Sequence, residues 1–102
     1  MTKVSRIVLS ARAEQDLTAI FHRTLERWGE AQARRYAELI DGRLSVLTKV
    51  SGAGRAKPEL GEGVRSIPIG AHIIFFKISG DEALVLSVRH AKRRAPTAKD
   101  FA

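Results

Sequence analysis

The sequence has no cysteine, no long hydrophobic run and a shortage of acidic residues. Because none of the 102 residues carries a thiol, disulfide bonds and thiolate chemistry are excluded, and a reducing cytosol is the expected compartment. No apolar run approaches the roughly 20 residues that a membrane-spanning helix needs. No hydrophobic signal-peptide region precedes the first predicted strand either. A cytoplasmic protein is therefore predicted.

Positive charge dominates what is present. The chain carries 18 lysines and arginines against 11 aspartates and glutamates, a formal net charge of +7. Such a surface favours nucleic acid, an anionic site on another protein, or an acidic partner, and charge alone does not choose among these. A chain of 102 residues builds one modest core, so a single domain over residues 1–102 is predicted.

The stretch 64–90 predicts three strands in a meander. Val, Ile and Phe dominate it, and glycines punctuate it at hairpin spacing. The predicted strands are residues 64–69, 72–79 and 83–90.

Turn lengths predict the register of this meander. A two-residue turn at 70–71 and an odd, three-residue loop at 80–82 keep the apolar side chains of all three strands on one face. The predicted cross-strand pairs are Arg65 with Phe76, Ile67 with Ile74, Ile78 with Leu84, Phe76 with Leu86, and Ile74 with Val88.

The second face of this sheet is a candidate functional surface. Successive side chains of a strand point to opposite faces, so one face packs under helices and the other needs a cover of its own. Large apolar groups beside cations favour a docking surface there. The alternative, that the chain's own end folds back over this face, stays open. The predicted face consists of Ile73, Phe75, Lys77, Val85, Ser87 and Arg89.

Two helices are predicted upstream of the meander. After a short β-branched strand over residues 4–9, Ser10 is placed to cap a helix over 11–28, which Gly29 ends. A second helix is predicted over 30–50. The short joint between them makes the two helices antiparallel neighbours.

The apolar stripes of these helices predict which residues face the sheet. Trp28 and Tyr36 lie on the stripes, so both are expected to anchor the core rather than to bind a ligand. The stripes comprise Ala13, Leu17, Ile20, Phe21, Thr24 and Trp28 in the first helix, and Ala33, Tyr36, Ala37, Ile40, Leu44 and Leu47 in the second.

The remaining stretches are a connector and a tail. Residues 48–63 are rich in glycine and carry several cations, which favours a basic loop and fits neither the Walker nor the dinucleotide-binding pattern. Residues 91–102 form a basic tail that is expected to be flexible unless bound. The predicted fold class is therefore α+β, in the order β-α-α-β-β-β, with a helical hairpin packed on one face of an antiparallel sheet.

The order and spacing of short motifs resemble the toxins of the RelE/ParE superfamily, and ParE toxins most closely. The resemblance extends over about nine tenths of the chain. The residues that carry it are Leu9-Ser10, Ala13, Asp16-Leu17, Ile20, Trp28-Gly29, Gln32-Ala33, Tyr36, Leu39, Gly54-Arg55, Pro58-Glu59-Leu60, Gly63-Val64-Arg65, Gly70 and His72-Ile73-Ile74-Phe75-Phe76.

This resemblance implies one half of a bacterial type II toxin–antitoxin pair. ParE-like members inhibit DNA gyrase, whereas RelE-like members cut messenger RNA in the ribosome. The resemblance favours the first activity, because the only tyrosine lies in a predicted helix and no aromatic hydroxyl follows the last strand. An acidic ParD-like antitoxin is the implied partner, gyrase the implied target, and no cofactor is implied.

The alternative activity, ribosome-dependent RNA cleavage, would rest on Arg65, Arg89 and His90. These residues occupy places where the nuclease branch keeps basic catalytic groups. Cleavage through the 2′-hydroxyl needs a base, a cation for the phosphate and an acid for the leaving oxygen. Arg89 and His90 are adjacent in a strand and so face opposite ways, which disfavours a joint role.

The histidines do not predict a metal site. His72 and His90 are expected to lie across from each other on the helix side, but no Asp, Glu or Cys nearby offers a third ligand. No metal is therefore predicted.

The predicted antitoxin-binding surface combines the open sheet face with the cationic tail. Apolar anchors would bind the partner, and cations would orient its carboxylates. The predicted residues are Ile73, Phe75, Lys77, Val85, Arg89, Lys92, Arg93 and Arg94. A third possibility, a plain basic nucleic-acid binder, ranks last because few exposed aromatic residues are predicted for stacking.

Overall fold

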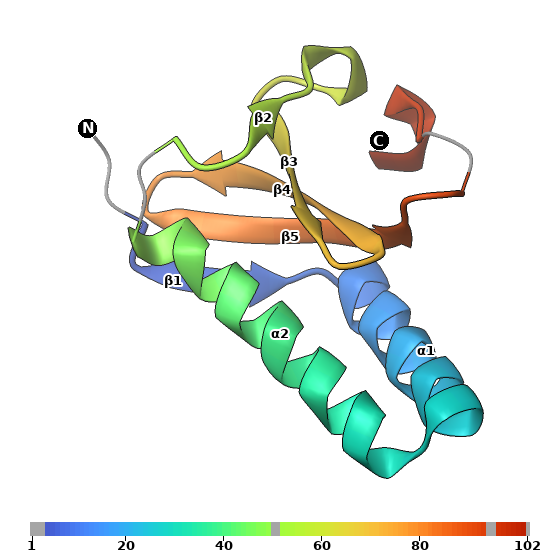
Figure 1. The fold of residues 1–102 in the computed structure, drawn as a ribbon. Coiled ribbons are helices and arrows are strands. Elements are labelled where there is room, and N and C mark those ends of the chain that lie inside the picture. The colour runs from blue at the N-terminus through green and yellow to red at the C-terminus, as the bar shows by residue number, and fades with distance from the viewer. Residues whose placement is uncertain (1–3, 50–51, 94–95, 102) are drawn as a thin grey trace.

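The fold is a helical hairpin on one face of a five-stranded sheet (Figure 1). The computed structural model describes residues 4–49, 52–93 and 96–101. The sheet order is β1-β5-β4-β3-β2. In the described ranges, no helix is long and apolar enough to cross a membrane. The elements are β1 (Arg6–Leu9), α1 (Ala11–Trp28), α2 (Glu30–Lys49), β2 (Arg55–Ala56), η1 (Pro58–Leu60), β3 (Val64–Ile69), β4 (His72–Ser79), β5 (Glu82–His90) and η2 (Ala98–Phe101).

Local sequence signals place both helices where they were predicted. The Ser10 side chain accepts a hydrogen bond of 3.0 Å from the backbone N–H of Ala13, which caps α1. At its other end, Gly29 adopts a φ of 88°, a conformation that glycine tolerates best, so the chain turns directly into α2. The predicted helical hairpin is confirmed.

The meander is also confirmed, with one addition and one change. The turn at 70–71 pairs Ile67 with Ile74 and Arg65 with Phe76, as predicted. β1 runs parallel to β5, so the sheet is mixed rather than purely antiparallel. The short β2, which the sequence did not predict, pairs with β3 at the opposite edge.

The predicted register between β4 and β5 is partly wrong. Ile74 does pair with Val88, but a β-bulge beside Phe76 shifts the remaining pairs. Since the turn at 80–81 has two residues instead of three, Phe76 faces Val85 and Ile78 faces Ala83. Val85 therefore points into the core under the helices and is 0% exposed, so its predicted place on the open face is wrong.

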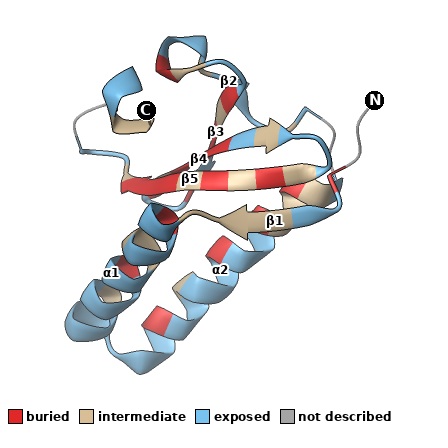
Figure 2. Ribbon diagram, turned by 180° about the vertical axis from the view of Figure 1, so that it is seen from behind, coloured by how far each residue is buried: buried red, intermediate tan, exposed pale blue. Residues whose placement is uncertain are grey.

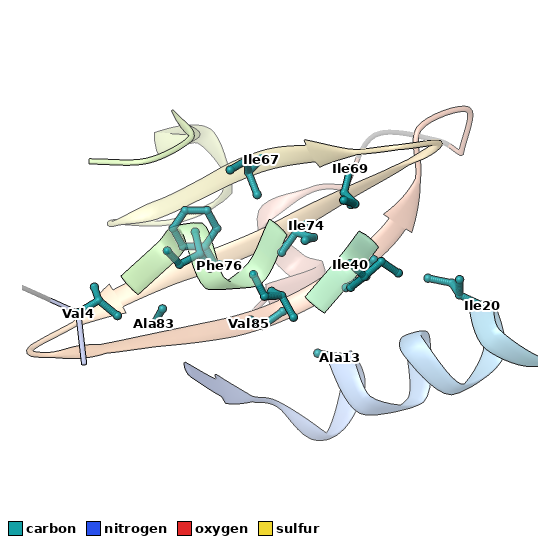
Figure 3. Packing of buried hydrophobic residues seen from close by; sticks show 13 residues of the cluster. Val4, Ala13, Ile20, Ile40, Ile67, Ile69, Ile74, Phe76, Ala83 and Val85 are labelled. Atoms are coloured by element: carbon teal, nitrogen blue, oxygen red, sulfur yellow. The ribbon is translucent and has the colours of Figure 1, made fainter. Parts of the chain in front are cut away.

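The main core lies between the sheet and the helical hairpin (Figure 3). Side chains from β3, β4 and β5 meet Ala13 and Ile20 of α1 and Ile40 of α2. Figure 2 shows buried positions along β5, while most of the outward surface of the hairpin is exposed. A second, smaller cluster of Leu60, Val64 and Phe75 forms on the other face of the sheet.

The predicted core role of Trp28 is wrong. Trp28 ends α1 at the tip of the hairpin and is 70% exposed. Tyr36 is half-buried, and its hydroxyl donates to the carbonyl oxygen of Ile69 at 3.2 Å. The periodic stripe thus predicts correctly the residues that lie under the sheet, such as Ala13 and Ile20, but Phe21 and Ala37 on the same stripes are exposed as well.

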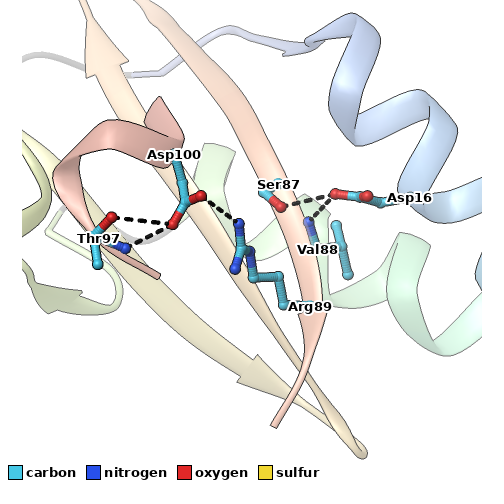
Figure 4. A network of polar contacts seen from close by, with 6 residues as sticks. All are labelled: Asp16, Ser87, Val88, Arg89, Thr97 and Asp100. Atoms are coloured by element: carbon cyan, nitrogen blue, oxygen red, sulfur yellow. Dashed lines mark hydrogen bonds and ion pairs between the residues drawn. The ribbon is translucent and has the colours of Figure 1, made fainter. Parts of the chain in front are cut away.

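α1 also satisfies part of the free edge of β5. β1 pairs with β5 only from Glu82 to Val85. Farther along, the carboxylate of Asp16 accepts hydrogen bonds from the Ser87 hydroxyl at 2.8 Å and from the Val88 N–H at 3.0 Å (Figure 4). A helix side chain thus replaces a neighbouring strand at these buried donors.

Candidate functional site: a basic groove beside the C-terminal turn

The C-terminal turn η2 covers part of the second sheet face. The rings of Phe101 and Phe75 have centroids 5.5 Å apart. The Phe75 side chain, which was predicted to be exposed, is only 4% exposed. The alternative prediction, that the chain's own end folds back over this face, is therefore the correct one at Phe75. The described part of the tail that was predicted to be flexible, residues 96–101, includes this turn.

A groove of about 630 Å³ lies along the sheet between η1 and the segment that follows β5, and its charged lining residues are mainly cations. Five lysines and arginines line it, against one carboxylate, that of Glu59. An anionic ligand is the natural complement of such a lining. The lining residues are Arg43, Gly54, Arg55, Lys57, Glu59, Leu60, Ser66, Ile67, Pro68, Ile73, Phe75, Arg89, His90, Ala91, Arg93 and Pro96.

Arg89 is the buried cation of this groove. Its side chain is 8% exposed, and its Nη2 lies 3.5 Å from Oδ1 of Asp100 (Figure 4). Among the described residues, its Nε has no hydrogen-bond partner. A buried guanidinium with an unused donor favours a further anion, because that donor has lost its water without full compensation.

Asp100 is held in place by its own turn. Its carboxylate accepts a hydrogen bond of 2.7 Å from the Thr97 N–H. This hydrogen bond, followed by the charge of Arg89, holds the pKa of Asp100 below its ordinary value. The tail thus presents an ionised carboxylate to Arg89.

The predicted docking residues separate into groups. Ile73, Phe75, Arg89 and Arg93 line the groove. Lys77 and Lys92 are exposed but lie outside its lining. Val85 faces the opposite side of the sheet, and Arg94 lies outside the described residues.

The sequence interpretation missed the groove wall that the connector supplies. Arg55 and Lys57 belong to a stretch that was predicted only as a basic loop. Pairing of β2 with β3 brings Arg55 beside the sheet, and a hydrogen bond of 2.8 Å from the Lys57 N–H to the Val64 carbonyl oxygen does the same for Lys57. Among the motifs of the resemblance, Gly54-Arg55 and Pro58-Glu59-Leu60 mark this wall, and they are the signal that could have found it.

The three predicted nuclease residues do not converge. The Arg65 guanidinium donates to the carbonyl oxygens of Gly52, Ala53 and Gly54 at 2.8–2.9 Å, so it fastens the connector to the sheet. Arg89 lies in the groove and pairs across the sheet with Ile73.

His90 pairs with His72, as predicted. Their ring centroids are 5.1 Å apart in an edge-on arrangement, and the Tyr36 hydroxyl contacts Nδ1 of His72 from the helix side. In the described parts of the chain, no group of three His, Cys, Asp or Glu residues is placed to hold a metal ion.

The family model described as "ParE toxin of type II toxin-antitoxin system, parDE" matches residues 7–95. The chain belongs to this family of ParE toxins. It is 30% identical to toxin ParE1 of Mycobacterium tuberculosis over 86% of this chain and 91% of that relative. It is 31% identical to toxin ParE of Escherichia coli, over 83% of this chain and 84% of the relative.

A solved structure shares the fold of this ParE-family toxin. It is that of a chromosomal ParDE toxin–antitoxin system from P. aeruginosa, with a TM-score of 0.74 and 22% identity. The alignment covers 87% of this chain and 97% of that one. The predicted RelE/ParE-like architecture is confirmed.

Proposed function

We propose that this ParE-family chain inhibits DNA gyrase in the cytoplasm and is held inactive by an acidic, ParD-like antitoxin. The observation that carries the proposal is the match of the ParE family model over residues 7–95. The relatives from Mycobacterium tuberculosis and Escherichia coli, which resemble the chain over most of its length, are both ParE toxins. On this proposal the chain acts by binding and is not an enzyme.

The geometry of the basic residues supports inhibition by binding over RNA cleavage. General acid–base chemistry needs its groups within hydrogen-bond reach of one reacting centre. Arg65 is occupied by three connector carbonyls, and Arg89 lies beside Asp100. The His90 ring stacks edge-on against His72.

We assign antitoxin binding to the basic groove. An acidic segment would place carboxylates against the exposed Arg55 and Arg93 and the half-buried Lys57, and cations at such positions mainly speed encounter and fix orientation. The apolar groups Ile73 and Leu60 at the same groove would receive an aliphatic or aromatic anchor. Burial of that anchor would supply most of the affinity, because apolar area carries the larger free energy.

A supercoiling assay tests the proposal. Purified toxin, titrated to micromolar concentration, is expected to stop DNA gyrase from supercoiling relaxed plasmid, and prior addition of the antitoxin encoded by the neighbouring reading frame is expected to restore supercoiling. If gyrase works unimpaired while programmed ribosomes show cleaved messenger RNA, the gyrase proposal is wrong and the RelE-type alternative replaces it.

A further inference from the structure

A second concave site lies on the helix side of the sheet and shares the lining residue His90 with the basic groove. This hollow, of about 240 Å³, sits between the hairpin tip, the turn at 70–71 and the paired histidines. Its lining residues are Ile20, Arg23, Thr24, Arg27, Trp28, Gln32, Tyr36, Ala71, His72 and His90. Neither the antitoxin assignment nor the gyrase proposal uses it.

Basic groups converge on this hollow without a carboxylate. Arg23 and Arg27 are four residues apart on α1, so they share one helix face and lie about 6 Å apart along the axis. His72 and His90 contribute from the sheet, and the lining includes no Asp or Glu. The positive charges of the two arginines beside this concave space favour an anion within it.

Both histidines are oriented by polar contacts, His90 with the Lys92 N–H and His72 with the Tyr36 hydroxyl. Nδ1 of His90 accepts the Lys92 N–H at 3.1 Å, so the neutral ring carries its proton on Nε2 and keeps a donor free. His72 contacts the Tyr36 hydroxyl, which also accepts the Ala71 N–H at 3.2 Å. Burial, and then the charges of His90 and Arg23, lower the pKa of His72 below its ordinary value of 6.5.

Trp28 gives the hollow an aromatic rim. It is the only tryptophan in the chain, and 70% of its surface is exposed although it adjoins the two arginines in the lining. Exposed aromatic rings beside cations are the usual stacking platforms for the bases of single strands. A nucleotide supplies in one unit both an anion for the interior and a flat ring for the rim.

We propose that this hollow binds one nucleotide unit of single-stranded nucleic acid, its phosphate against Arg23, Arg27 and His90 and its base against Trp28. Recognition by a phosphate contact and by stacking carries no base-sequence information of its own. Among the described residues the hollow shares His90 with the lining of the basic groove, whereas Arg23, Arg27 and Trp28 line the hollow and not the groove.

The intrinsic fluorescence of Trp28 reports binding at the site itself. A short oligothymidylate is titrated into the full-length toxin at low salt, and a stacked base is expected to quench the fluorescence. The single phosphate contact of the proposed site contributes about 0.7 to the slope of log affinity against log salt concentration, and the two arginines share this contact, so that each accounts for about half of it. Arg23→Gln and Arg27→Gln are each expected to weaken binding and lower this slope by about that half.

The matched control is Arg12→Gln, which removes the same charge from an exposed position near the other end of α1. It is expected to leave the quenching titration close to that of the parent. Trp28→Ala, followed by anisotropy of a labelled oligothymidylate, is expected to weaken binding by at least about fivefold. Arg23, Arg27 and Trp28 are all exposed, so these variants retain the fold, which thermal unfolding verifies.

Three results would overturn the proposal. The first is the absence of oligothymidylate binding. The second is binding that leaves Trp28 fluorescence unchanged, or that Arg12→Gln weakens as much as Arg27→Gln does, because the whole basic surface would then be responsible. The third is quenching of Trp28 fluorescence by polyglutamate but not by oligothymidylate, which would mean that the hollow binds an acidic protein segment instead.

Discussion

The carboxylate of Asp100 lies 3.5 Å from the Arg89 guanidinium, so the chain's own C-terminal turn neutralises the buried cation of the basic groove (Figure 4). The same turn places Phe101 against Phe75. One apolar and one ionic contact, from adjacent residues, thus attach the tail to the sheet. This attachment explains why a strand face rich in large apolar groups is buried without a partner.

Truncation of Phe101 measures the apolar half of that attachment. Phe101→Ala is expected to lower the free energy of unfolding by about 1 kcal/mol, since offset aromatic pairs contribute roughly 0.5–1.5 kcal/mol beyond their buried area. Chemical denaturation with urea checks it. Lys99→Ala, an exposed change in the same turn, is the control. Equal stability of Phe101→Ala and the parent would mean that the turn does not pack on Phe75 in solution.

Asp16 supplies a test of the edge of β5. Asp16→Ala leaves the buried Ser87 hydroxyl and the Val88 N–H without their acceptor, which is expected to cost about 1–3 kcal/mol. Asp16→Asn keeps one side-chain oxygen and is expected to lose less. Denaturant unfolding measures the stability of both variants. If Asp16→Asn loses as much free energy of unfolding as Asp16→Ala, the charge of Asp16 and not its hydrogen bonds stabilises this edge.

The fold followed from the sequence because its signals are local. Strand alternation, the cap at Ser10 and the glycine after Trp28 each act within a few residues. The β5 register could not be predicted from such signals. A turn shorter by one residue and a bulge beside Phe76 decide which face Val85 occupies. A shift of one residue in a strand moves each side chain to the opposite face of the sheet.

The candidate sites were harder to predict because they join distant segments. The basic groove combines Arg55 and Lys57 of the connector with Arg89 of the sheet, which comes more than thirty residues later in the sequence. Trp28 matched the apolar stripe, but how far a helix extends past the sheet is a tertiary property that helical periodicity does not contain.

Removal of single positive charges from the groove is expected to weaken antitoxin binding selectively. Arg55→Gln and Lys57→Gln are each expected to weaken antitoxin binding by about two- to fivefold at low salt, with a smaller effect as salt rises, because exposed charges are screened. Lys77→Gln is the matched control, since Lys77 is an exposed lysine outside the groove lining. Calorimetric titration at two salt concentrations measures all three. If Lys77→Gln weakens binding as much as Lys57→Gln, the antitoxin does not sit in the groove.

His72 is expected to make folding stability depend on pH. Burial, with the charges of His90 and Arg23, lowers its pKa in the folded state below the ordinary 6.5. Between that folded pKa and 6.5 the unfolded chain binds the extra proton, so stability rises with pH through this range. The contribution is complete above 6.5 and is lost as the pH falls through the folded pKa.

Urea unfolding of the parent and of His72→Gln between neutral and mildly acid pH measures this contribution, and the stability of the variant is expected to depend less steeply on pH. His22→Gln, a substitution at an exposed position on α1, removes a histidine without altering this cluster and is expected to keep the parent's slope. An identical slope for parent and His72→Gln would mean that His72 gains its proton as readily in the fold as in the unfolded chain, and the surrounding charges would then have to be neutralised by bound anions from the buffer.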